Sequence, residues 1–156
     1  MKKIFLLAAM IVLSSSCSND EKVSENETAT IIGKWQLTDI LENGIPLSGY
    51  SCNKEFDTNQ FLSNDRSVVS YSDKNTNNVC VQIFEEQTYT VVDNVLTETQ
   101  KNGSIKIYEA KYKIKELKTA SLKLETISVF ESNSNGSNPI TTNYSTEEEV
   151  KVYKKI

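Results

Sequence analysis

The feature that most restricts the fold of this chain is the alternation of apolar and charged residues in short segments after residue 30. In the clearest case, apolar or aromatic residues at every second position from Tyr108 to Ile114 alternate with glutamate and lysine. Successive side chains of a β-strand point to opposite faces, so this segment predicts a strand with one buried and one wet face. No comparable helical periodicity follows the N-terminal segment. The alternation therefore predicts an all-β domain.

Other segments rich in β-branched and aromatic residues predict the remaining strands. They are residues 34–41, 66–72, 79–84, 87–92, 95–99, 122–125 and 150–153. Asp93-Asn94 and Asn102-Gly103 are turn dipeptides that tolerate positive φ, and each separates two predicted strands. About eight short strands joined by hairpins predict an up-and-down antiparallel barrel, with a β-sandwich as the alternative.

The N-terminus has the features of an export signal. Two lysines precede an apolar run over residues 4–13, which is shorter than the roughly 20 residues that a membrane-spanning helix needs. Three serines then lead directly to Cys17, and the segment resembles a lipobox, the motif at which bacterial lipoproteins are cut before a lipidated cysteine. Ser14 departs from the motif, because leucine is commonest at that position. The alternative is an ordinary secretory signal with an incidental thiol at Cys17.

This interpretation divides the chain into three parts. Residues 1–16 are the signal peptide, residues 17–30 are a polar tether without aromatic residues, and residues 31–156 form one domain. Acyl chains such as palmitate on Cys17 would hold the domain on the outer membrane. The acidic residues just after Cys17 resemble a signal that exports some lipoproteins to the cell surface, which leaves an outward orientation open.

Charge and composition exclude several classes of function. The net charge of −4 falls to about −6 once the two lysines of the leader are removed, which argues against a nucleic-acid partner. The chain has no histidine, which excludes Ser-His-Asp and Cys-His catalysis and most transition-metal sites. No phosphate-binding loop or complete calcium loop is present. We therefore expect no catalytic residue, metal or cofactor, and an enzyme built on carboxylates is the weaker alternative.

The cysteines predict a disulfide. The chain has three cysteines, and lipidation of Cys17 leaves Cys52 and Cys80 to pair with each other. Two remaining cysteines in a small exported domain favour a bridge in an oxidising compartment. Two separate buried thiols are the alternative.

The segment Ile31 to Thr38, with the sequence IIGKWQLT, resembles the opening of the lipocalin-like domains found in many bacterial lipoproteins. In that family a Gly-x-Trp motif begins the first strand, and the resemblance extends over most of residues 31–156. It implies that Trp35 packs across the closed end of the barrel as a structural plug, with a ligand contact as the alternative role. Gly33 would allow close backbone approach at the start of the strand.

Three tyrosines are the candidates for lining a ligand cavity. If the face that carries Tyr108 and Tyr112 points into the barrel, and Tyr89 joins it, the interior is apolar with a few hydroxyl groups. That composition suits a small apolar or amphipathic ligand. A barrel filled by its own side chains is the alternative. Such a barrel would act as a non-catalytic structural or interaction module that presents its loops to an envelope or host partner.

Overall fold

The structure is a computed structural model that describes residues 29–49, 52 and 54–156. The predicted signal peptide, Cys17 and the tether up to residue 28 lie outside the described residues. The strands are β1 (Gly33–Glu42), β2 (Ile45–Pro46), β3 (Thr58–Phe61), β4 (Arg66–Lys74), β5 (Cys80–Val92), β6 (Val95–Asn102), β7 (Ile105–Leu117), β8 (Ser121–Glu131), β9 (Ile140–Asn143) and β10 (Glu149–Lys155), with a short 3-10 turn, η1, at Lys54–Phe56. No helix in the described part of the chain is long and apolar enough to cross a membrane.

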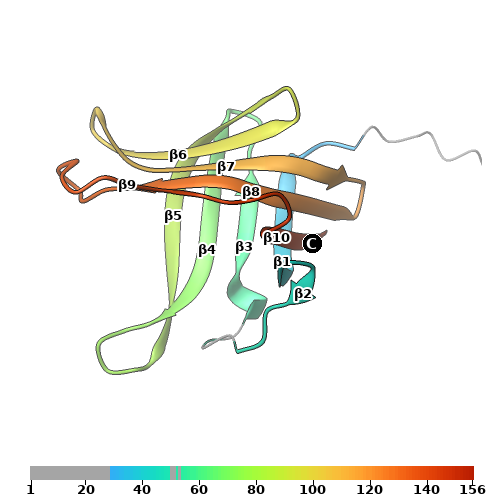
Figure 1. The fold of residues 1–156 in the computed structure, drawn as a ribbon, viewed down its shortest axis with the longest axis horizontal. Helices are drawn as coiled ribbons and strands as arrows, with labels where there is room; N and C mark the ends of the chain where they lie inside the picture. The colour runs from blue at the N-terminus through green and yellow to red at the C-terminus, as the bar shows by residue number, and fades with distance from the viewer. Residues whose placement is uncertain (1–28, 50–51, 53) are drawn as a thin grey trace, which may run out of the picture.

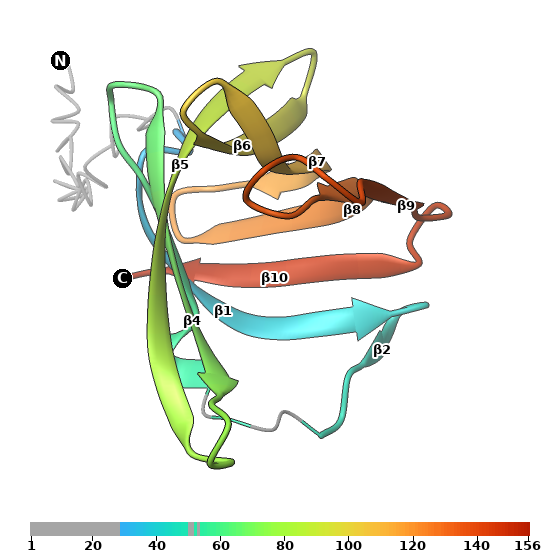
Figure 2. The ribbon, with the colours of Figure 1, turned by 90° about the vertical axis from the view of Figure 1, so that its left-hand side faces the viewer.

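Within these residues the strands close into one antiparallel barrel (Figures 1 and 2). The ring runs β1-β3-β4-β5-β6-β7-β8-β10, and β10 closes it by pairing with both β8 and β1. The short strands β2 and β9 attach to β1 and β8 outside this ring. The predicted all-β barrel of about eight strands is confirmed, and the sandwich alternative is wrong because a single sheet closes on itself.

The predicted strands differ from the observed ones at β5 and β3, and the short strands β2 and β9 were not predicted either. β5 runs without a break from Cys80 to Val92, although the sequence suggested two strands separated at Glu85-Glu86. These acids alternate like the rest of the strand: Glu86 forms an ion pair with Arg66, and Glu85 accepts a hydrogen bond from the Tyr71 hydroxyl. β3 was not predicted, because its four residues, TNQF, carry a single large apolar side chain.

One end of the barrel is filled by side chains. Trp35 is fully buried (0 % exposed), its indole N–H donates to the Ile31 carbonyl at 2.7 Å, and Lys155 Nζ lies 5.2 Å from its ring centroid. The buried core around it consists of Phe61, Tyr89, Leu96, Ala110, Tyr112, Ile114, Leu122 and Leu124. The β3–β4, β5–β6 and β7–β8 turns and the start of β1 meet at this end. We call it the closed end.

At the opposite end the strands separate. Pairing between β5 and β6 stops at Thr88 and Thr99, although each strand continues with its other neighbour. β8 likewise leaves β10 after Glu125 and pairs with β9 instead. The β4–β5 hairpin and the strands β6–β9 therefore diverge, as Figure 1 shows. The barrel is a cup, with its mouth opposite Trp35.

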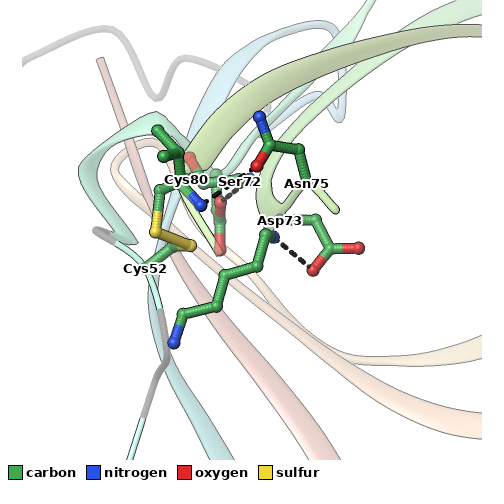
Figure 3. The surroundings of a disulfide bond; sticks show 8 residues. Cys52, Ser72, Asp73, Asn75 and Cys80 are labelled. Atoms are coloured by element: carbon green, nitrogen blue, oxygen red, sulfur yellow. Dashed lines mark hydrogen bonds between the residues drawn. A yellow bond between two sulfur atoms is a disulfide. The ribbon is translucent and has the colours of Figure 1, made fainter. Parts of the chain in front are cut away.

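Cys52 and Cys80 form a disulfide, as the cysteine count predicted. The bridge joins the connection between β2 and β3 to the first residue of β5. It lies beside Ser72, Asp73 and Asn75 at the tip of the β4–β5 hairpin (Figure 3). The covalent link is therefore at the open end, where the strands no longer pair all the way round.

Candidate ligand cavity

The interior is hollow over the open half of the barrel. A cavity of about 740 Å³ lies above the Trp35 core, within the volume range of small-molecule sites. Its apolar wall includes Leu37, Ile40, Val69, Ile107 and Ile140. The two alternatives that the sequence left open, a pocket and a filled interior, each describe one half of this barrel.

The three candidate tyrosines are not all in the same place. Tyr108 and Tyr112 line the cavity, together with Tyr153 of β10. Tyr89 is not among the lining residues and packs in the core at the closed end of the barrel. Its ring meets Phe61 edge-on at 5.0 Å between centroids, and its hydroxyl donates to the Leu62 carbonyl at 2.8 Å. Alternation identified the inward face of the strand, but it carries no information about depth along the barrel axis.

The floor of the cavity carries a buried acid, Glu98 of β6. Its side chain is 3 % exposed, and its Oε1 accepts hydrogen bonds from Asn59 Nδ2 at 2.8 Å and Ser67 Oγ at 3.1 Å. Burial raises the pKa of Glu98, although these two hydrogen bonds and the charge of Lys151 act in the opposite direction. A carboxyl group in such a place reduces stability when it ionises.

We expect Glu98→Gln to raise stability at neutral pH. The pKa of Glu98 is higher in the folded chain than its ordinary value of 4.5. The protonated side chain therefore favours the folded state fully at pH values below 4.5, and this contribution is lost as the pH rises through the pKa of the folded state. Glutamine keeps an acceptor for Asn59 and Ser67 and carries no charge. Urea denaturation at several pH values between about 4 and 8 should show that the native chain loses stability relative to the variant as the pH rises. A difference that does not change with pH would contradict the assignment, and the exposed Glu86→Gln is the control.

Among the described residues that line the cavity, Lys151 carries the single ammonium group, and its charge acts on Glu98. Lys151 of β10 donates to the Tyr112 hydroxyl at 3.4 Å and lies 3.8 Å from Glu149. Burial opposes its charge, but Tyr153, Glu149 and the other acidic groups around it raise its pKa overall. Burial also raises the pKa of Tyr108, Tyr112 and Tyr153, so their hydroxyls stay neutral at physiological pH.

Two amide side chains on the cavity wall have polar atoms without partners. Asn59 is 4 % and Gln87 is 6 % exposed, and the oxygens Asn59 Oδ1 and Gln87 Oε1 are buried without a hydrogen bond. Buried polar atoms in folded proteins almost always have a partner, since an unmade hydrogen bond costs about 1–3 kcal/mol. Both residues line the cavity, although these two oxygens have almost no surface open to it, so a ligand would reach them only after a side-chain rotation.

The sequence held signals for these floor residues. Glu98 stands two positions after the buried Leu96, and Gln87 stands two positions before the buried Tyr89, so period-2 alternation places both inside. The inward orientation of Lys151 was harder to predict. Its neighbours Val150 and Val152 form an apolar face that suggested the core side, but this face points away from the cavity. Within the described ranges, no group of three or more histidine, cysteine, aspartate or glutamate side chains could hold a metal ion.

A match to a family model agrees with this architecture. The family model of the lipocalin-like domain matches residues 31–124. Among solved structures, a lipocalin-like protein from Bacteroides uniformis aligns over 80 % of this chain and 97 % of its own, with 13 % sequence identity and a TM-score of 0.46. No curated protein matches the chain.

Proposed function

This chain belongs to the lipocalin-like domain family, and on that premise we propose that its barrel binds a small amphipathic molecule and is held on the outer membrane by a lipid on Cys17. The cavity of about 740 Å³ is the observation that carries the binding proposal. Its apolar wall and polar floor match a molecule with an apolar body and a polar head group. A filled interior would have favoured an interaction module instead.

A cavity-filling substitution tests the binding proposal. Val69 lines the cavity, whereas its neighbour Val68 does not, and both side chains are half-buried on β4. We expect Val69→Trp to weaken binding of an environment-sensitive apolar dye by about ten-fold or more, because the indole occupies the ligand volume. Val68→Trp, the matched control, should bind the dye like the native chain. Equal binding by both variants would show that the dye does not enter the cavity.

Native mass spectrometry of the purified protein complements the dye-binding measurement. A small molecule that co-purifies with the native chain and is absent from Val69→Trp would support the cavity as its site. The same molecule retained by both variants would place it elsewhere.

The anchor is supported by the leader sequence, in which an apolar run and three serines lead to Cys17. We expect Cys17→Ala to move the protein from the membrane fraction to the soluble periplasmic fraction, because each buried acyl CH₂ contributes about 0.8 kcal/mol of membrane affinity. Ser18→Ala is the matched control and should stay with the membrane. Continued membrane fractionation of a Cys17→Ala chain whose leader has been removed would overturn the lipidation proposal.

A further inference from the structure

The floor of the cavity presents acceptor atoms from adjacent strands. Ser67 on β4 pairs with Gln87 on β5, and the Ser67 hydroxyl reaches Glu98 on β6 at 3.1 Å. Asn59 on β3 reaches the same carboxylate at 2.8 Å. Asn59, Gln87 and Glu98 therefore form one connected patch on the inner face of β3–β6, which we call the acceptor floor.

Each member of the acceptor floor has an oxygen without a partner in the part of the chain that the structure describes. Asn59 Oδ1 and Gln87 Oε1 are buried and unsatisfied. Both hydrogen bonds that Glu98 accepts end on Oε1, and none ends on Oε2. Oxygen acceptors of this kind are satisfied by N–H or O–H donors, and a carboxylate is satisfied best by a cationic donor.

The charges on the cavity wall favour a cation. Among the described residues that line it, Asp57, Glu85, Glu98 and Glu131 carry carboxyl groups, and Lys151 alone carries an ammonium group. Glu149, 3.8 Å from Lys151 Nζ, already offsets that positive charge. A cavity lined mainly by one sign of charge raises the local concentration of ligands of the opposite sign.

We propose that this cavity selects amphipathic amines, with the protonated amino group on the acceptor floor and the apolar body against Leu37, Ile40 and Ile107. This inference rests on the proposed binding function and names the chemical class of its ligand. The amino group donates to Glu98 Oε2, on which no hydrogen bond from the described residues ends, and a rotation of the Gln87 or Asn59 amide would bring its unsatisfied oxygen to the same group. An amphipathic acid lacks these donors and meets repulsion from Glu98.

The test compares three molecules with the same ten-carbon chain. Decylamine, decanol and decanoic acid each compete with the apolar dye for binding to residues 17–156, which carry Cys17→Ala, at neutral pH. We expect decylamine to bind more than about ten-fold tighter than decanoic acid, the size of one charge-assisted hydrogen bond. Glu98→Gln should remove most of the preference for decylamine over decanol, while the exposed Glu86→Gln keeps it.

The outcomes separate the two proposals. If the dye and all three molecules fail to bind, the proposed function fails. If decanol binds but decylamine has no advantage over it, or if decanoic acid binds tightest, the cavity still binds ligands and the selection of amines is overturned. In the last case the head group lies on Lys151 and Tyr112 instead. Circular dichroism checks the fold of Glu98→Gln, and Gln87→Leu, which should also weaken decylamine binding, provides a second test that leaves Glu98 intact.

Discussion

Replacing Trp35 with alanine is expected to lower the free energy of unfolding by about 3–5 kcal/mol, the cost of removing a large buried aromatic side chain. Trp35 has no exposed surface, and its indole N–H bonds to the Ile31 carbonyl at 2.7 Å. The variant therefore loses both the packing of the closed end and a hydrogen bond. It also loses the single tryptophan of the chain, so circular dichroism, rather than fluorescence, should follow urea denaturation.

Trp35→Phe is the matched comparison. It keeps an aromatic ring in the core and loses the indole donor, so its cost should be well below that of alanine. A loss of less than about 1 kcal/mol for alanine would contradict the view that Trp35 is the centre of a continuous core.

The second large effect concerns the disulfide. Replacing Cys52 and Cys80 together with alanine is expected to lower the free energy of unfolding by roughly 3–4 kcal/mol, because the bridge closes a long loop and restricts the unfolded chain. The two cysteines are 28 positions apart. Urea denaturation of the native chain with and without reductant should show the same loss.

The double variant supplies the control for that experiment, because reductant should not change its stability further. Equal stability of the native and double-variant chains would contradict a stabilising role for the bridge. Because the bridge lies at the tip of the β4–β5 hairpin, its loss should also increase hydrogen exchange in that hairpin more than around Trp35.

The fold was predictable from the sequence because its strands are long and strongly patterned. The alternation from Tyr108 to Ile114 corresponds to part of β7, and Asp93 and Asn94 have the positive φ values, 49° and 64°, that a tight hairpin turn requires. β3 escaped prediction because four residues are too few to show a period. The sequence predicted a closed barrel but not which strands close it, since the pairing of β10 with β1 joins the two ends of the domain.

The cavity was predictable only in part. The alternation put Tyr108 and Tyr112 inside, but the expected apolar interior omitted Glu98, Gln87 and Lys151, because hydrophobic patterning assumes that charged residues face water. A cavity with a polar floor does not follow this assumption, because its inner wall carries charged and amide side chains, which a filled apolar core would not contain. Tyr89 and Tyr108 show the complementary limit: both were expected to face inward, and only the tertiary structure shows that Tyr89 packs in the core while Tyr108 lines the cavity.

Both ends of the domain lie beside the plug. Gly33 and Trp35 begin β1 at the closed end, and Lys155, near the C-terminus, pairs with Trp35. On a chain anchored through Cys17, the tether would therefore join the barrel at its closed end, where β1 begins. The mouth of the cavity therefore lies at the end of the barrel opposite Gly33 and Lys155.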